Sequence, residues 1–316
     1  NLRQMKIVQI HPGCGIPVPP PSWGAIEKIV WEFICNQKEL GHEVDLRWSG
    51  DIKLGEYDIV HVHVANLAIQ LADKGIPYVY QLHDHHAYHY GKESHVYLEN
   101  LKAIEGSVVS LVPARFLVDY FDHPKVEYFA HGVNIDEFYP TIKPTPKLLM
   151  VANNGLGGDA TFDRKGFTYG WGLAVKNNLP ITIAGPSANK QFFNSHLWML
   201  NYPKLNLVFD TPNSTLLELY HNHDIFIHPT MLEAGHPNLT MVEAAASGLP
   251  IIANWEYATT FHGAWRAPRD VFEMDKGLKD IMTNWDTYTS KSINTGKELS
   301  WLNRSTEIIK VYQKYL

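Results

Sequence analysis

A repeated alternation of short apolar runs with helical patterns constrains the fold of this chain more than any other feature of its sequence. In the first half, the apolar runs cover residues 5–10, 43–48, 58–62, 78–81 and 108–112. The pattern then restarts, with runs at residues 147–151, 181–184, 205–209, 224–228 and 250–253. Strands that alternate with helices in this way build βαβ units and parallel sheets. The sequence therefore predicts an α/β fold with two similar halves.

Helices are expected between these runs. Residues 25–40 carry apolar side chains at helical spacing, and Gly41 follows where a helix-ending glycine belongs. Further helices are predicted over residues 166–177, 215–221 and 238–247, and over the tail at 298–316. The apolar side of this last helix is formed by Trp301, Ile308, Ile309 and Tyr312.

A proline-rich stretch separates the two halves. Residues 132–146 contain Pro140, Pro144 and Pro146 and lack helical periodicity, so they are predicted to link two domains. A chain of 316 residues is long enough for two separate cores. We expect domains over residues 1–143 and 144–297, followed by the helix at 298–316. Ligands of α/β folds bind in the cleft that such halves leave between them.

Charge and composition argue against several classes of protein. The 27 Lys and Arg residues against 33 Asp and Glu give a net charge of −6, and the basic residues of the first half are scattered. This argues against a large nucleic-acid footprint, which needs clustered Lys and Arg. No apolar run approaches the ~18 residues of a membrane span, and the N-terminus lacks the pattern of a signal peptide. With only two cysteines, the chain is expected to be cytoplasmic and without integral membrane association.

The stretch at residues 228–250 is the most informative about chemistry. It runs from an apolar strand through a Gly/Pro loop into a helix of small residues, with Asn238 as its expected N-cap and Gly248 at its end. A helix N-terminus beside Gly235 suits an anion such as phosphate. Glu233 and Glu243 flank it, and carboxylates accept hydrogen bonds from sugar hydroxyls. The alternative is that Glu233 is a cap and Glu243 a solvated helix residue.

This stretch resembles the donor-site signature of retaining glycosyltransferases of the GT-B fold, family 4. The matching features are Glu233, Gly235, and Glu243 followed by AAASGLPII, although nine residues separate the two glutamates where seven are usual. Residues 131–140 (HGVNIDEFYP) are similar to the interdomain stretch of that family. Residues 20–27, 41–44 and 58–63 resemble its N-terminal loop and its next two strand entries. The similarities span nearly the whole chain.

The resemblance implies a fold and an activity. The fold would be α/β of the GT-B type, with two Rossmann-like domains whose parallel sheets face a central cleft, and the C-terminal helix would return toward the first domain. The activity would be transfer of a hexose, with retention, from a nucleotide sugar such as UDP-glucose to an unidentified hydroxyl acceptor. UDP, GDP and ADP donors all remain open. No resident cofactor and no essential metal would be needed.

The resemblance also implies roles for particular residues. Glu243 would bind the ribose, Glu233 the sugar hydroxyls, and Lys165 with Arg164 the diphosphate. Lys165-Gly166 is similar to the Lys-Gly of the family, whose usual arginine lies five or six residues earlier, whereas Arg164 directly precedes Lys165 here. The alternative for this pair is an exposed basic start of a helix. The other residues expected at the donor are Gly24, Gly235, His236, Pro237, Asn238, Leu239 and Thr240.

A histidine-rich segment follows the predicted strand at residues 78–81. It reads QLHDHHAYHY over residues 81–90. By resemblance, His83 would lie close to the transferred sugar and act as a catalytic residue together with Glu233. Structural histidines and a metal site that includes His61 and His63 are the alternatives, although the spacing does not fit a zinc hydrolase motif. Trp23, Tyr88 and Tyr90 are expected in loops that face the cleft, where aromatic rings stack on sugars or bases.

Other interpretations of the sequence differ in class. Residues 155–160 match the dinucleotide pattern G-x-G-x-x-A, but residues 175–179 offer no acidic partner for a ribose, which argues against a nicotinamide or flavin site. A GT-B glycosyltransferase could also modify DNA bases, which the scattered basic residues disfavour. A metal-dependent hydrolase built on the histidines is a further alternative, and stoichiometric bound metal would support it. Two others are a nucleotide-sugar epimerase, which the GT-B fold also serves, and a protein that binds the nucleotide sugar without turning it over.

Overall fold

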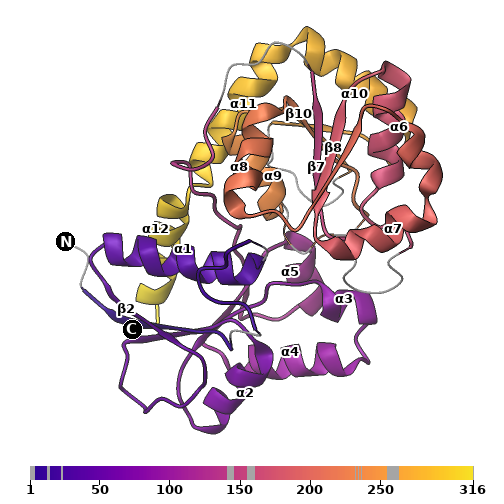
Figure 1. The fold of residues 1–316 in the computed structure, drawn as a ribbon. Helices are drawn as coiled ribbons and strands as arrows, with labels where there is room; N and C mark the ends of the chain where they lie inside the picture. The colour runs from indigo at the N-terminus through magenta and orange to yellow at the C-terminus, as the bar shows by residue number, and fades with distance from the viewer. Residues whose placement is uncertain are drawn as a thin grey trace.

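The computed structural model describes residues 4–12, 15–22, 24–140, 146–154, 161–231, 233, 235, 237–254 and 263–315. These residues form two lobes, each built around a six-stranded parallel sheet (Figure 1). Trp23, His236 and residues 155–160, which the sequence singled out, lie outside the described residues. In the part of the chain that the structure describes, no helix combines the length and apolar character that a membrane span requires.

The first lobe holds a sheet with the strand order β2-β1-β3-β4-β5-β6. Its strands are β1 (Lys6–Ile10), β2 (Glu43–Arg47), β3 (Ile59–Val62), β4 (Val79–Gln81), β5 (Val109–Val112) and β6 (Val126–Tyr128). Its helices are α1 (Ala25–Glu39), α2 (Ala65–Asp73), α3 (His86–Tyr90), α4 (His95–Gly106) and α5 (Arg115–Phe121). Strands β1, β3, β4 and β5 are almost wholly buried, as expected for a sheet covered by helices on both faces.

The second lobe holds a sheet with the order β12-β11-β10-β7-β8-β9. Its strands are β7 (Leu148–Val151), β8 (Ile181–Gly185), β9 (Leu205–Phe209), β10 (Ile225–His228), β11 (Ile251–Ala253) and β12 (Ala264–Arg266). Its α-helices are α6 (Phe167–Asn177), α7 (Lys190–Ser195), α8 (Asn213–Asn222), α9 (Leu239–Ala246), α10 (Val271–Thr283) and α11 (Trp285–Glu298). Two 3₁₀ helices, η1 (Ser187–Asn189) and η2 (Leu197–Asn201), flank α7.

The last helix, α12 (Trp301–Gln313), runs from the second lobe to the first, where it packs against α1 (Figure 1). The four apolar residues named above for the tail are buried there in one cluster with Met5, Ile7 and Phe33 of the first lobe. The connecting segment, residues 129–140, is pinned to the start of this helix. The backbone N–H of Val133 donates to the carbonyl of Leu299 at 2.8 Å, and that of Trp301 donates to the carbonyl of Val133 at 2.9 Å.

Most predicted elements are present within one or two residues of the predicted limits, including all ten apolar runs as strands. The structure differs from the sequence-based expectations in two places. Strands β6 and β12 were not predicted, because each has three residues and only one of the six is fully buried, so neither forms an apolar run. Tyr88 and Tyr90 belong to helix α3 and not to a loop. The Tyr88 ring packs edge-on against Phe116 and Tyr120, so it supports the first lobe.

Candidate active site between the two lobes

A buried ion pair occupies the second lobe where its central strands end. The Nζ of Lys165 donates to Oε1 of Glu233, and Nε2 of His228 lies 3.6 Å from the same oxygen. Burial alone would raise the pKa of Glu233, but the nearby Lys165 and His228 lower it to about 2. Burial lowers the pKa of Lys165, and Glu233 opposes that shift. The pair therefore stays ionised, and Lys165 is not an exposed basic residue.

The loop before α6 is built to hold this lysine. The backbone N–H of Lys165 donates to Oδ1 of Asn154 at 3.1 Å, and the guanidinium of Arg164 donates to the carbonyl of Asn153 at 2.9 Å. Gly166 has φ +76°, and a Cβ there would lie 2.6 Å from the carbonyl oxygen of Pro229. Only glycine fits this position, which brings Lys165 and Arg164 beside the loop that follows β10.

Helix α9 begins at the same place. Oδ1 of Asn238 accepts a hydrogen bond from the backbone N–H of Met241 at 3.0 Å, which confirms Asn238 as the N-cap. Nδ2 of Asn238 also lies 3.2 Å from Nε2 of His228. The first N–H groups of a helix, here those of Leu239 and Thr240, have no intrahelical carbonyl to bind and carry the positive end of the helix dipole. Through His228, which also lies 3.6 Å from Glu233, this helix end adjoins the Lys165–Glu233 ion pair.

Glu243 lies on α9 and is buried rather than solvated, so the alternative of a solvated helix residue is wrong. Its Oε1 is 2.7 Å from Nζ of Lys28 on α1, and its Oε2 accepts a hydrogen bond from the Tyr220 hydroxyl at 3.0 Å. Burial would lower the pKa of Lys28, but the carboxylates of Glu243, Glu137 and Glu32 together outweigh this effect and raise it. Gly24, at the N-cap of α1, accepts a hydrogen bond from the backbone N–H of Lys28. The ion pair thus joins the two lobes.

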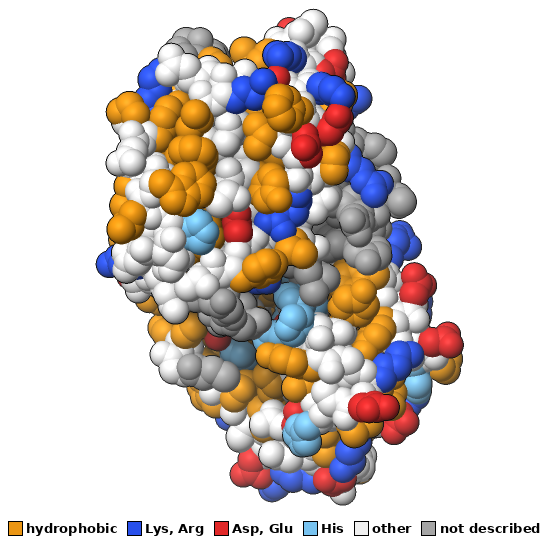
Figure 2. Space-filling model, turned by 90° about the vertical axis from the view of Figure 1, so that its right-hand side faces the viewer, with side chains coloured by type: hydrophobic (Ala, Val, Ile, Leu, Met, Phe, Trp, Pro, Cys, Tyr) orange, Lys and Arg blue, Asp and Glu red, His pale blue; other side chains and the backbone are white. Residues whose placement is uncertain are grey.

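Histidines of the first lobe face this cluster. His83, just after β4, and His131, in the connecting segment, are both buried, and their rings stack with centroids 6.4 Å apart. A Cβ on Gly235 would lie 2.9 Å from Nδ1 of His131, so the loop of the second lobe reaches the histidines. Burial lowers the pKa of His85 to about 4, and the charges of Glu233, Arg164 and Lys165 also act on its ring. Histidine side chains gather in the hollow between the lobes (Figure 2).

A smaller pocket opens beside His83 in the first lobe. Its volume is about 270 Å³, and it lies where β3 and β4 end, the edge of a parallel sheet at which ligands bind. The polar side chains that line it are those of His63, Asn66, Tyr80, His83, Asp84, Glu99 and Asn100. The charges of Asp84 and Glu99, which both line the pocket, help burial to raise the pKa of Tyr80.

The structure therefore brings together most of the residues that the sequence singled out. Lys165, Arg164 and Glu233 meet the N-terminus of α9, and the backbone carbonyl of Pro237 lies 3.0 Å from the Cβ position of Gly235. Gly24 belongs to the α1 side of the cleft, and His236 is outside the described residues. Sequence reasoning missed His131, His228, Lys28 and Tyr220. A signal existed for His131, which directly precedes the Gly132-Val133 pair of the interdomain stretch.

The histidines do not form a metal centre among the described residues, where no group of three or more His, Cys, Asp or Glu side chains is placed to hold a metal ion. His61 and His63 instead lie in the core with their rings tilted to each other and their centroids 4.4 Å apart. Burial lowers the pKa of both rings, which makes them neutral at pH 7.

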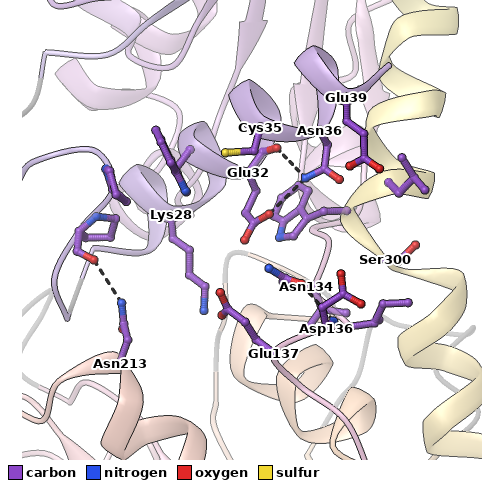
Figure 3. A pocket seen from close by; sticks show the side chains of 17 residues that line it. Lys28, Glu32, Cys35, Asn36, Glu39, Asn134, Asp136, Glu137, Asn213 and Ser300 are labelled. Atoms are coloured by element: carbon purple, nitrogen blue, oxygen red, sulfur yellow. Dashed lines mark hydrogen bonds between the residues drawn. The ribbon is translucent and has the colours of Figure 1, made fainter. Parts of the chain in front are cut away.

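A larger cavity of about 630 Å³ lies on the α1 side of the connecting segment. Figure 3 shows Lys28, Glu32 and Asn36 projecting from α1 over Asn134 and Glu137. Burial and the charge of Glu137 raise the pKa of Glu32 to about 7, against the opposing effects of Lys28 and the two asparagines. This cavity is rich in carboxylates and borders the Lys28–Glu243 ion pair.

The architecture defines the class: the chain has the GT-B fold. The sucrose-phosphate synthase of Thermosynechococcus elongatus is similar to it with a TM-score of 0.78 over 99% of each chain, at 13% identity. HepE of Anabaena, solved in complex with UDP-glucose, has a TM-score of 0.72 at 12% identity over 99% of this chain and all of that one. The catalytic domain of starch synthase IV from Arabidopsis thaliana, bound to ADP and acarbose, has a TM-score of 0.69 at 11% identity over 99% of each chain.

No protein-family model and no curated protein sequence matches the chain. The structural similarity, at these low identities, shows the fold.

Proposed function

We propose that the chain is a glycosyltransferase of the retaining class, related to family 4, which moves a hexose from a nucleotide sugar to a hydroxyl acceptor. UDP-glucose is the donor that we would test first, since HepE, with the same fold, was solved with that molecule. The observation that carries the proposal is one arrangement of charges. Lys165, Arg164 and the N-terminus of α9 face the buried histidines of the other lobe, with Glu233 between them.

Each part of this arrangement has a role in such a transfer. The diphosphate would bind Lys165, Arg164 and the N–H groups at the start of α9, because all of these favour negative charge. Glu233 would accept hydrogen bonds from the sugar hydroxyls. Glu243 would bind the ribose hydroxyls, since a carboxylate has about four acceptor sites and its two known partners leave acceptor capacity.

Catalysis would be mainly electrostatic. As the bond between sugar and diphosphate breaks, negative charge grows on the departing phosphate, and a fixed positive site lowers the energy of that state. Neither a metal ion nor a resident cofactor is part of the proposal. His83 would contact a hydroxyl near the reacting carbon, and contact between the lobes would exclude water and so favour transfer over hydrolysis.

The acceptor would enter from the first lobe. The pocket beside His83 presents hydrogen-bonding groups suited to a small hydroxyl compound, and its two carboxylates disfavour an anionic one. A nucleic-acid acceptor is not favoured for the same electrostatic reason. The identity of the acceptor is the part of the activity that a screen must supply.

The experiment that tests the proposal is a thermal-shift panel of UDP-, GDP- and ADP-sugars, with and without chelator. A donor at 100 times its dissociation constant adds about 2.7 kcal/mol to stability, which raises the melting temperature by several degrees. The shift is expected to survive chelation, to disappear in Lys165→Ala, and to persist in Lys310→Ala, an exposed lysine on α12. Donor binding that is unchanged in Lys165→Ala would exclude this site, and a shift with zinc alone would favour the hydrolase.

A further inference from the structure

A chain of buried side chains in the first lobe leads from the C-terminal helix to His83. Nε2 of Gln37 donates to the Tyr312 hydroxyl at 3.3 Å, and Nε2 of Gln9 donates to Oε1 of Gln37 at 3.0 Å. Oε1 of Gln9 lies 2.7 Å from Nε2 of His63, whose Nδ1 lies 2.8 Å from Nε2 of His83. Gln9, Gln37 and Tyr312 are fully buried, and His63 is 3% exposed. Side chains buried to this extent are normally apolar, so a row of polar ones here indicates a specific structural or functional role.

The chain fixes where each proton lies. An amide oxygen only accepts, so Nε2 of His63 carries a proton and donates it to Gln9. Burial keeps the pKa of His63 well below its usual value, and the ring is neutral. Its Nδ1 is therefore unprotonated and accepts from Nε2 of His83. Since burial also keeps the pKa of His83 well below its usual value, that ring is neutral as well, with its lone pair at Nδ1.

This lone pair has no hydrogen-bond partner among the described residues. His83 is 9% exposed, and its Nδ1 is buried. An unpaired polar atom loses its hydrogen bonds to water on burial and gains none in return, so such atoms are rare and each one needs a structural or functional explanation. The neighbouring His131 also has both ring nitrogens unpaired among those residues. The unpaired atoms lie where the two lobes face each other.

We propose that Gln9 and His63 are positioning residues that hold His83 in the tautomer protonated at Nε2, so that its Nδ1 accepts a hydrogen bond from a substrate hydroxyl. The contact with substrate rests on the proposed glycosyl transfer, whereas the tautomer is a property of the free protein. The two parts can therefore fail separately.

The far end of the chain agrees with this direction. The Tyr312 hydroxyl, which accepts from Gln37, lies 2.6 Å from Nδ1 of His61. A hydroxyl that accepts once and donates once fits here if His61 is neutral and unprotonated at Nδ1, and burial does lower the pKa of His61 to about 3. Rotating both glutamine amides by 180° would reverse every bond, including the one at His83. All the hydrogen bonds between Tyr312 and His83 therefore share one donor-to-acceptor direction, and the tautomer of His83 reports it.

Nuclear magnetic resonance of protein labelled with ¹⁵N-histidine measures it directly. Long-range ¹H–¹⁵N correlation at pH 7 is expected to show His63 and His83 neutral and protonated at Nε2, with signals assigned from H63Q and H83Q. A His83 protonated at Nδ1, or charged, overturns the proposal. This result needs neither donor nor acceptor, so it stands whether or not the protein transfers sugar.

Variants at Gln9 test the positioning role. Q9L removes the acceptor for His63 and is expected to give mixed tautomers at His83 and about a tenfold lower kcat, with KM for the donor unchanged. Q9E keeps an acceptor and is expected to restore the Nε2–H tautomer and most of kcat. The control is Y78F, which removes a buried hydrogen bond to the carbonyl of Ala103 in the same lobe.

Each outcome of the series has a definite meaning. One outcome is that Q9L, Q9E and Y78F all lose kcat only to the extent that their melting temperatures fall. In that case the row of hydrogen-bonded side chains only stabilises the fold, and the positioning role is excluded. If the wild-type protein neither binds a nucleotide sugar nor releases UDP, glycosyl transfer fails and the substrate contact of His83 fails with it. The spectrum then decides the tautomer alone.

Discussion

The buried pair of Lys165 and Glu233 shows how single residues set the properties of this site. Each side chain would be costly to bury alone, and each stabilises the charge of the other. K165M is expected to reduce the free energy of unfolding by about 3 kcal/mol, because it removes the main charge partner of the buried Glu233 carboxylate. Urea denaturation at pH 7 measures this loss.

The double variant K165M/E233Q separates the two effects of that pair. With both charges absent, stability is expected to recover by more than half, while nucleotide-sugar binding stays lost because the cation is missing. A double variant as unstable as K165M would show that packing, and not charge, explains the cost.

Gly166 is the second residue on which the site depends. G166A forces a side chain into a left-handed backbone conformation and within 2.6 Å of the Pro229 carbonyl oxygen. Strain and overpacking together are expected to cost about 3 kcal/mol. Gly75 offers a matched control, since it has φ +67° and open space around its Cβ position, so G75A carries only the strain of about 1 kcal/mol. Equal losses in the two variants, measured by thermal unfolding, would contradict the close packing of the Lys165 loop.

At the scale of elements, helix α9 links stability to anion binding. N238A removes the cap that satisfies the N–H of Met241 and is expected to cost about 1 kcal/mol. Because the same helix end would receive the diphosphate, donor affinity is expected to fall by about tenfold as well. S300A is the control, since it removes a comparable cap, to the N–H of Asn303, on α12, a helix that has no part in the proposed diphosphate site. Isothermal titration with UDP measures the affinity of both variants. Equal affinities in N238A and S300A would show that the start of α9 is not part of the donor site.

The elements were largely predictable from sequence, because long apolar periodicities decide buried strands and helices. The periodicity of residues 25–40 gives α1, and the order Asn238 to Gly248 gives both ends of α9. Strand β12 leaves no such pattern, because none of its three residues is fully buried and hydrogen bonds to β11 define it. Contacts between lobes are also invisible to periodicity. Nothing local to Lys28 predicts its bond to Glu243, which is 215 residues away.

The same division applies to the site. Lys165, Glu233 and the start of α9 could be proposed from a motif, since the motif carries its own spacing. The buried chain from Gln9 to His83 could not, because its members come from β1, α1, the ends of β3 and β4, and α12. Only the parallel pairing of β1 with β3 and of β3 with β4 brings these side chains together.

At the scale of the whole molecule, the cavity beside the connecting segment makes stability depend on pH. Burial and Glu137 raise the pKa of Glu32 from its ordinary 4.5 to about 7, so between these values the folded protein holds a proton that the unfolded chain has released. Stability therefore falls as pH rises from 4.5 to 7 and is level on either side of that window, as far as Glu32 decides it.

E32Q removes this dependence. At pH 8 the variant is expected to be more stable than the wild-type protein by about 3 kcal/mol. Below pH 4 the two are expected to be nearly equal, because the Glu32 carboxyl is then protonated in both the folded and the unfolded state. E39Q is the control, since Glu39 also lines the cavity but is exposed. Urea denaturation of the three proteins across this range measures the difference. An E32Q curve parallel to that of the wild-type protein would show that Glu32 is charged throughout, and that the contact between α1 and the connecting segment tolerates two adjacent carboxylates.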